Sequence, residues 1–592
     1  MNFLKRVLST VTGIFVFMGI FIGLCFGLFL ILGVIVGSSS KETITVRDKT
    51  VLDLKLDFPI RDYAAQTVFV DYPFLNENKK NGLFDIINAI DYAASDSKIK
   101  GISMDNNFIM AGVSQTKAIR DALLRFKNSG KFIVAYADIY TQKDYYLSSV
   151  ADTIYMNPVG AMEFKGLSTE RLYFKDFQEK TGLKMEVIRL GKYKSAVEPY
   201  LENEMSDNNR EQISVYLNGL WSEIKDEISQ SRGVTTEELN TIADSLLART
   251  ATLAEKSKLI DRIAYYDEYA SDLKKAVGTD VEKGVNTISI EKYSKYVADK
   301  TILGSSKNKI AVIYAEGQII YGEGNETFVG QGTINESLKK AREDDRIKAI
   351  VLRVNSPGGS ALASELIWRE IELTKKIKPV VVSMGDVAAS GGYYIACNAD
   401  RIFAEPTTIT GSIGVFGTLP NGKGLADKMG INAEQVVTNK NALTYSFFEP
   451  LSEDQRVFIK EGVNDIYELF TQRVADGREG LTQDDVKAIA QGRVWTGKDA
   501  LNNGLIDDLG GLDEALKYAA ELSEIEDYKI KELPVFEKSL EEIMQGFGLV
   551  KSREAILKEE LGEENYKILK EVKTMTEQKG IQLLFPFNVE IK

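Results

Sequence analysis

A serine in a glycine-rich stretch is the residue of this sequence that most resembles a nucleophile. Ser390 lies in GDVAASGGYYIACNAD, residues 385–400, between two alanines and two glycines, where an apolar run gives way to a helix-like pattern. This setting suits a nucleophile, but a serine hydroxyl attacks only after a base takes its proton. Histidine is the most common base, and the 592 residues include none. The base must therefore be a residue of another type.

The chain contains two copies of one domain. A shift of 248 residues aligns KIKGISMDNN (98–107) with RIKAIVLRVN (346–355), and YYLSSVADTIYMNP (145–158) with YYIACNADRIFAEP (393–406). The second pair shares six identities in fourteen positions. One unbroken register over about ninety residues indicates a duplicated domain and excludes the short period of a solenoid.

Each copy alternates between strand and helix patterns. In the second copy KIAVIYAEGQII and IKAIVLRVN are apolar strands, whereas INESLKKAREDD and LASELIWREIELTKK have helical periodicity. This alternation predicts an α/β domain with a largely parallel sheet, and residues 200–265 and 451–520 are expected to be helical appendages. The predicted domains are an N-terminal segment with a membrane anchor (1–46), a first repeat (47–300), a second repeat (301–530) and a charged, mostly helical tail for packing or oligomer contacts (531–592).

The two copies keep different candidate groups. Ser390 aligns with Gln142, so the first copy lacks the nucleophile. Gly358 and Gly359, in NSPGGS after a buried strand, align with a methionine and an alanine. A Gly-Gly turn can present backbone N–H groups to an anion. Pro-Gly turns also occur without any function, but together with Ser390 this turn favours an oxyanion hole in the second copy.

A lysine is the best candidate for the missing base, because a neutral amine is an attested partner of catalytic serines. The first copy contains GKYKSAVEPY (191–200), and its Lys194 aligns with Ala442 in the second copy. One copy has the lysine and the other has the serine and the glycines, so we expect a composite site where the two domains meet. Lys194 would need its pKa lowered by roughly three units through burial away from carboxylates. Lys192 is the competing candidate, because on an extended segment it would share the face of Lys194.

The N-terminus predicts a membrane anchor. Residues 7–40 carry no charge, and their apolar core from Val11 to Val36 exceeds the roughly 20 residues that cross a bilayer. Lys5 and Arg6 precede it, so the positive-inside rule places the N-terminus in the cytoplasm and the other domains outside. A cleaved signal peptide is the alternative, with GSSS as its cleavage region, but such signals have apolar spans of roughly 7 to 15 residues.

Composition argues against several classes of partner. The formal net charge of -13 disfavours nucleic acid or an anionic surface. Without histidine and with only Cys25 and Cys397, a zinc or transition-metal site is not expected, and no cofactor is predicted. A disulfide is not expected either, because Cys25 lies in the apolar N-terminus and Cys397 in a helix-like stretch.

Four motifs, GKYKSAVEP, LRVNSPGGS, GDVAASGGYY and TGSIGVFG, occur in an order that resembles the long, duplicated form of signal peptide peptidase A, a family of membrane-anchored bacterial serine proteases. The similarity extends from the N-terminal segment to about residue 525. It implies tandem crotonase-like domains, as in Clp protease, and a bowl-shaped homotetramer. It also implies that the substrates are cleaved signal peptides and other apolar peptides, on the outer side of the bacterial cytoplasmic membrane.

The resemblance also implies a role for individual residues. Ser390 would be the nucleophile, and Lys194, directly before Ser-Ala-Val-Glu-Pro, would be the general base in preference to Lys192. Ser412, in TGSIG, would hold the amine of the lysine in place. The oxyanion hole would comprise Gly358, Gly359 and the N–H of Gly391. The second lysine, Lys192, stands at a position where family members vary.

Two other functions remain open from the sequence. A non-catalytic, membrane-tethered scaffold that binds peptides would predict erosion of the serine, lysine or glycine positions, and none is eroded. An acyl-thioester enzyme would have a similar oxyanion hole, but it leaves the complementarity of Ser390 and Lys194 unexplained. Asp386 aligns with Asp138, which is kept in the copy without a nucleophile, so a structural role such as a turn or cap is expected for it.

Overall fold

The computed structural model describes residues 44–64, 67–68, 81–106, 108–278, 284–302, 306–537 and 580–584, with short pieces between 13 and 27 and between 557 and 566. The apolar span predicted from Val11 to Val36 therefore lies largely outside the described residues. Within the described part of the chain, no helix is both long and apolar enough to cross a bilayer. The predicted anchor thus stays a prediction.

The first repeat is built on a six-stranded parallel sheet. Its strands are β1 (Thr50–Asp53), β3 (Ile99–Asp105), β4 (Phe132–Tyr140), β5 (Thr153–Met162), β7 (Arg262–Ile263) and β8 (Asn286–Ser289), in the order β7-β5-β4-β3-β1-β8. The connecting helices include α2 (Leu83–Ser95), α3 (Val113–Lys127) and α4 (Gln142–Ser148). The central strand β4 (FIVAYADIY) is mostly apolar, as expected for a parallel sheet with helices on both faces.

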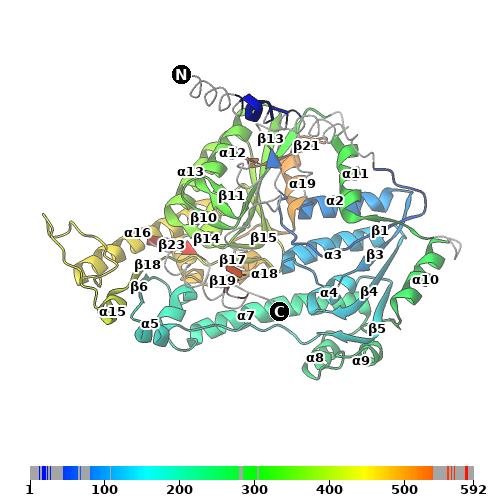
Figure 1. The fold of residues 1–592 in the computed structure, drawn as a ribbon, viewed down its shortest axis with the longest axis horizontal. Helices are drawn as coiled ribbons and strands as arrows, with labels where there is room; N and C mark the ends of the chain where they lie inside the picture. Colours follow the sequence, from blue (N-terminus) through cyan, green and yellow to red (C-terminus); the bar gives the residue numbers. More distant parts are fainter. Residues whose placement is uncertain are drawn as a thin grey trace, which may run out of the picture.

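The second repeat has the same plan. Its sheet runs β19 (Val494–Thr496), β17 (Ile409–Gly411), β15 (Val380–Ala389), β13 (Ile347–Ser356), β9 (Lys309–Glu316) and β21 (Lys529–Leu533), with β16 (Arg401–Ala404) and β20 (Asp508–Leu509) joined beside β15. Its helices include α12 (Gln331–Glu343), α13 (Ala361–Lys375) and the short α14 (Gly391–Ala396). In Figure 1 the strands β1, β3, β4 and β5 of the first repeat lie on the right, whereas β6 (Lys184–Arg189), α5 (Lys175–Thr181) and the start of α7 (Asp207–Arg232) reach across to the second repeat on the left.

The duplication predicted from the sequence is confirmed element by element. The strands β3 and β13 begin at Ile99 and Ile347, and β4 and β15 begin at Phe132 and Val380. Both pairs are 248 residues apart, as the alignment requires. The helical appendages also correspond, and they are α7 (Asp207–Arg232), α8 (Thr236–Asp244) and α9 (Ala251–Lys256) in the first repeat and α16 (Glu453–Gly477), α17 (Gln483–Ile489) and α18 (Gly497–Asn502) in the second.

A third sheet joins the two repeats. It contains β11 (Gly324–Asn325), β12 (Phe328–Gly330), β10 (Gln318–Ile320), β14 (Gly358–Ser360), β23 (Gly580–Leu584), β18 (Phe416–Asn421) and β6 (Lys184–Arg189), in that order. The strand β6 comes from the first repeat and pairs antiparallel with β18 of the second, from Arg189 opposite Phe416 to Lys184 opposite Asn421. These strands lie side by side in Figure 1. The sheet therefore fixes the segment that precedes Lys194 against the second repeat.

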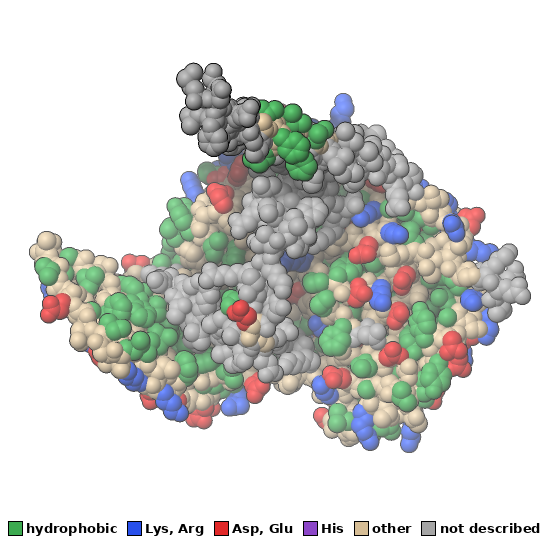
Figure 2. All heavy atoms as spheres, viewed as in Figure 1, with side chains coloured by type: hydrophobic (Ala, Val, Ile, Leu, Met, Phe, Trp, Pro, Cys, Tyr) green, Lys and Arg blue, Asp and Glu red, His purple; other side chains and the backbone are tan. Residues whose placement is uncertain are grey.

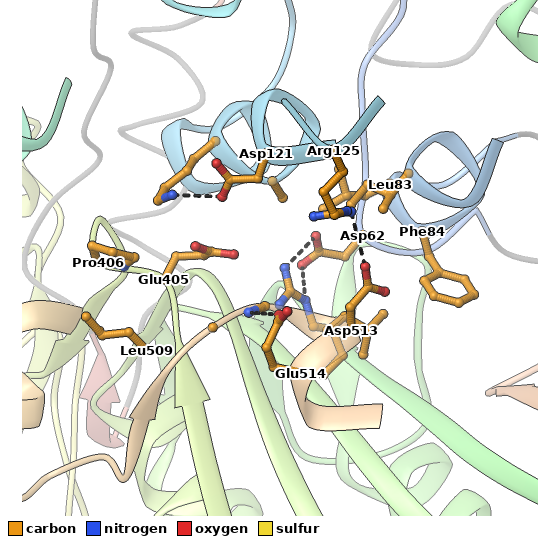
Figure 3. A pocket seen from close by; sticks show the side chains of 17 residues that line it. Asp62, Leu83, Phe84, Asp121, Arg125, Glu405, Pro406, Leu509, Asp513 and Glu514 are labelled. Carbon is orange, nitrogen blue, oxygen red and sulfur yellow. Dashed lines mark hydrogen bonds and ion pairs between the residues drawn. The ribbon is translucent and has the colours of Figure 1, made fainter. Parts of the chain in front are cut away.

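The interface between the repeats combines apolar packing with buried charge. Ile213, Tyr216 and Leu220 of α7 pack against Ala389 and neighbouring apolar side chains of the second repeat. Arg353 of β13 forms a buried ion pair with Asp62, with Nε and Oδ2 3.2 Å apart. Figure 3 shows the cavity beside this pair, lined by charged side chains from both repeats. Removing one partner of such a pair leaves the other charge buried and uncompensated, so the loss of either residue should destabilise this interface.

Candidate active site

Ser390 occupies a tight turn between the strand β15 and the helix α14. It is fully buried, and its backbone has φ 55° and ψ -114°, a region that costs a residue with a side chain about 1–3 kcal/mol. Its N–H donates to Gly411 O at 2.8 Å, which holds the turn. The following glycines are required by space, because a Cβ on Gly392 would lie 2.5 Å from Ser356 O. The Ser-Gly-Gly sequence therefore follows from the geometry of this turn.

Lys194 reaches the same point from the first repeat, in the segment after β6. Its side chain is completely buried. The neighbouring Tyr193 N–H donates to Gln491 O at 3.0 Å, which ties the lysine segment to the second repeat. Gly492 has φ 81°, and a Cβ there would lie 2.6 Å from the Cβ of Lys194. A glycine is needed at this position because the two backbones approach so closely.

The amine of Lys194 contacts three oxygen atoms of the second repeat. Its Nζ lies 2.8 Å from Ser390 Oγ, 3.0 Å from Ser412 O and 3.1 Å from Ser412 Oγ. Ser412 also has a positive φ, 51°, so both serines that flank the amine have strained backbones. The structure thus brings together Lys194, Ser390 and Ser412, as the sequence predicts.

Burial lowers the pKa of Lys194 well below its usual value of 10.5, and desolvation is the cause. A neutral amine has two N–H donors and one lone pair. Ser412 O can only accept and Ser412 Oγ can also accept, so both N–H groups can be used on that residue. In a neutral amine with both N–H groups used in this way, the lone pair would be left for the hydroxyl of Ser390, which is the arrangement that a general base needs.

Lys192 does not take part in this cluster. The chain turns at residues 191–193 instead of staying extended, so the expectation that the two lysines share a face is wrong. Lys192 is exposed, and its Nζ lies 4.9 Å from the centre of the Tyr193 ring. Its charge is therefore held by an aromatic face, away from Ser390.

The Gly358–Gly359 turn lies beside the nucleophile. These glycines have φ 95° and φ 157°, values that favour glycine. A Cβ on Gly391 would lie 3.1 Å from Gly359 N, so the two backbone segments are in close proximity. The N–H of Gly358 donates to Ser356 Oγ at 3.1 Å. The backbone of Gly391 and the N–H of Gly359 therefore lie close together beside Ser390, which suits the stabilisation of an oxyanion.

A strand from the C-terminal tail lies next to this turn. Residues Gly580–Leu584, the strand β23, pair antiparallel with β14 on one side and with β18 on the other. Leu583 is fully buried, and its carbonyl oxygen would lie 2.1 Å from a Cβ on Gly358. The sequence did not predict this strand. Its only local signal is the short apolar run in GIQLL within a charged tail that was expected to be helical.

Comparison with known proteins finds matches along most of the chain. The profile of "Peptidase family S49" matches residues 125–280 and 372–526. "Protease 4" of Haemophilus influenzae is 37% identical over 517 residues, covering 85% of this chain and 83% of its own. "Protease 4" of Salmonella typhi is 36% identical over 511 residues, covering 84% of this chain and 81% of its own. "Serine protease SPPA, chloroplastic" of Arabidopsis thaliana is 36% identical over 464 residues, covering 77% of this chain and 68% of its own.

Among solved structures, a ClpP1 mutant from Listeria monocytogenes matches with 14% identity and a TM-score of 0.24, covering 36% of this chain and 95% of its own. A likeness at this level does not establish a shared fold. The crotonase-like assignment of each repeat therefore stays a prediction.

Proposed function

Because the chain belongs to peptidase family S49 and is a serine protease, we propose that it cleaves peptides with a dyad of Ser390 and Lys194. The observation that carries this proposal is the 2.8 Å distance between Ser390 Oγ and the Nζ of a fully buried lysine. A buried lysine without an ion pair is rare, because its charged form is costly to bury. A base for the serine is the function that best accounts for it.

In the proposed reaction, neutral Lys194 takes the proton of Ser390 while Oγ bonds to the carbonyl carbon of the scissile peptide. The ammonium then gives this proton to the leaving nitrogen, and an acyl-enzyme ester remains. Water attacks the ester with Lys194 again as the base, and the proton passes back to Ser390 Oγ as the acid product leaves. Ser412 keeps the amine aimed at Ser390 throughout by accepting its N–H groups.

The oxyanion of each tetrahedral intermediate would receive hydrogen bonds from the N–H groups of Gly359 and Gly391. Such donors, fixed in place before the reaction, stabilise developing negative charge without reorganising. The close approach of the two glycines supports this assignment.

We expect the substrate to bind as an extended strand between β14 and β18. The chain's own residues Gly580–Leu584 occupy this slot and pair with both neighbours, which shows that its two edges accept a peptide backbone. Main-chain pairing of this kind depends little on sequence, and buried side chains such as Leu583 add a preference for apolar residues. A substrate that binds here has to displace β23.

The proposed substrates are cleaved signal peptides and other apolar peptides at the bacterial cytoplasmic membrane. Several described residues near the N-terminus support a membrane contact, because they expose large hydrophobic side chains: Val16, Phe17, Met18, Ile20, Phe21 and Leu24. Figure 2 shows hydrophobic side chains gathered there, at the top of the molecule. The proposal includes a single-pass anchor, catalytic domains outside the cytoplasm and a homotetramer, for which the sequence and the family resemblance are the support.

The test is hydrolysis of an apolar, signal-peptide-like substrate by the full chain in detergent. Ser390→Ala and Lys194→Ala should each lose activity by at least about 10³-fold, whereas Lys192→Ala should retain it. Activity that survives Ser390→Ala would refute the dyad. A correctly folded but inactive wild type that binds the peptide would favour the scaffold function instead.

A further inference from the structure

Asp386, in the strand that carries the nucleophile, contacts a helix of the other repeat. Its Oδ1 accepts a hydrogen bond from the N–H of Ser114 at 2.8 Å and a longer one from the N–H of Gln115 at 3.4 Å. Both N–H groups belong to the first turn of α3, where backbone donors lack partners within the helix. The helix of one repeat is therefore capped by a carboxylate of the other.

The local sequence of α3 is adapted to this contact. Its N-cap residue is Gly112, which has no side chain that could cap the helix. A Cβ on Gly112 would lie 2.1 Å from Cγ of Asp386, so any larger residue would push the carboxylate away. The φ of Gly112 is -70°, a value that every residue adopts. Glycine is thus required here for space and not for its backbone conformation.

Asp386 lies where β15 changes partners. The strand pairs with β16 up to Met384 and with β17 from Val387 onward, so Asp386 lies between the two pairings. Ser390 follows four residues later. The cap on α3 therefore holds β15 at the one place where neither β16 nor β17 pairs with it.

The corresponding residue of the first repeat makes different contacts. Asp138 also lies at an irregularity of its strand, between Ala137 and Ile139. Its Oδ1 accepts hydrogen bonds from Tyr136 Oη at 2.9 Å and Asn157 Nδ2 at 2.8 Å, both in the same repeat. The shared aspartate thus has a local role in one copy and an inter-repeat role in the other.

We propose that Asp386 is a positioning residue for the reaction: by capping α3, its carboxylate fixes the strand of Ser390 relative to the repeat that supplies Lys194. The inference rests on the proposed function, because it matters only if these two residues react together. The pairing of β6 with β18 anchors the repeats near the lysine, and the Asp386 cap anchors them near the serine. Two anchors define the distance between base and nucleophile better than one.

The protonation of Asp386 depends on groups from several elements. Asp62 and Arg353 interact electrostatically with it, and so do Lys143 of α4 and Tyr216 of α7. Desolvation, followed by the charge of Asp62, raises the pKa of Asp386 to about 6. The carboxylate is therefore charged at pH 8 and mostly protonated at pH 5, where it interacts less with the positive end of the helix dipole.

The test compares Asp386→Asn with the wild type across pH, with Asp138→Asn as the matched control. At pH 8 the Asp386→Asn variant should lose about five- to tenfold in kcat with little change in KM, as expected for the loss of a charged helix cap. The ratio of variant to wild-type activity should rise toward one as the pH falls below about 6, because Asp386 of the wild type is then protonated and as neutral as the asparagine of the variant. Protonation of Lys194 lowers the activity of both proteins alike, so it does not change this ratio. Asp138→Asn should stay near the wild type at every pH.

Gly112→Ala supplies a second, independent variant. It should reproduce the loss at pH 8, and it should have little further effect when Asp386 is already alanine, because the clash is with that side chain. Wild-type kcat in both Asp386→Asn and Gly112→Ala would overturn the inference, as would an activity ratio that does not change with pH. Ser390→Ala is measured in the same assay. If Ser390→Ala retains activity, the proposed dyad is refuted. If Ser390→Ala is inactive while Asp386→Asn and Gly112→Ala are as active as the wild type, the dyad stands and only the role of Asp386 is refuted.

Discussion

The two repeats share a fold but use the nucleophile position in opposite ways. In the second repeat Ser390 stands at the start of α14 with its hydroxyl next to an amine. In the first repeat the same position is Gln142, whose Oε1 accepts hydrogen bonds from the N–H groups of Lys165 and Gly166 at 3.1 and 2.8 Å. There the side chain fixes a loop instead of facing a base.

The lysine and glycine positions differ in the same complementary way. Lys194 is buried, whereas its counterpart Ala442 lies in an exposed loop. Gly358 and Gly359 are buried, and their strand β14 pairs with β23 of the tail. Met110, the counterpart of Gly358, instead has 46% of its surface exposed. Each repeat has kept the part of the site that the other lost. The two repeats thus share their strands and helices, whereas the proposed dyad lies in a contact between them.

The largest expected effect of the difference between the repeats is at the Gly358–Gly359 turn. Gly359→Ala should lower kcat/KM by about 10²–10³, because a Cβ there would lie 2.0 Å from Ile319 O and would displace an oxyanion donor. The measurement is peptide hydrolysis under conditions in which unfolding is excluded by circular dichroism. The reverse change at the corresponding position of the first repeat, Ala111→Gly, should leave activity near the wild type. Equal effects at both positions would show that the turn has no special role.

The pH dependence tests whether burial of Lys194 creates the base. Only the neutral amine can accept the Ser390 proton, and burial lowers the pKa of Lys194 well below 10.5. The value of kcat/KM should therefore show no loss near pH 10.5 and should fall about tenfold per pH unit below that lowered pKa, apart from the five- to tenfold decrease expected as Asp386 is protonated near pH 6. An acid limb centred near 10.5, the usual pKa of a lysine side chain, would contradict a neutral base in the resting enzyme.

Removal of the tail strand tests the peptide slot, which has no counterpart in the first repeat, where residues 108–112 form no strand. A chain that ends at Lys579 should cleave peptides about three- to tenfold faster in kcat/KM, because the substrate no longer competes with β23. A synthetic peptide of residues 578–592 should restore inhibition in trans. A truncated chain that keeps its melting temperature but is slower would show that β23 helps to form the site.

The smallest expected effect is on stability. The pKa of Lys194 is lower in the folded than in the unfolded state, so the unfolded chain binds more protons and the lysine lowers stability below pH 10.5. Lys194→Met should raise the free energy of unfolding at pH 7 by roughly 0.5–2 kcal/mol. Denaturant titrations should show this gain shrinking as the pH approaches 10.5. Ala442→Met, at the exposed counterpart, should leave stability unchanged, and a destabilised Lys194→Met at pH 7 would contradict the argument.

Much of the fold and part of the site were predictable because they are local or repeated patterns. The apolar runs placed the strands β9 and β13 correctly, and the 248-residue register placed β3 at the position that corresponds to β13. The sequence also narrowed the base to a few residue types. It left Lys192 and Lys194 nearly equivalent, because a tight turn at 191–193 is not visible in the alternation of polar and apolar residues.

Other parts of the site gave little local signal. The pairing of β23 with β14 joins residues more than two hundred positions apart, and a five-residue apolar run does not indicate its partner. The Asp386 cap on α3 was equally hidden, because its partners are backbone N–H groups of the other repeat. The sequence predicted only a structural role for Asp386, such as a turn or a cap, and not the helix that it contacts.

The sequence by itself determined that the domain is duplicated, that histidine is not the base, and that the serine and the glycines are in one copy while the lysine is in the other. The tertiary structure decided that the amine of Lys194 is desolvated and that it lies 2.8 Å from an oxygen 196 residues further along the chain. The physical reason is that the sequence shows which side chains can act as base or nucleophile, whereas the burial of Lys194 and its distance to Ser390 depend on how the two repeats pack. In this protein the contact between Lys194 and Ser390 is part of that interface.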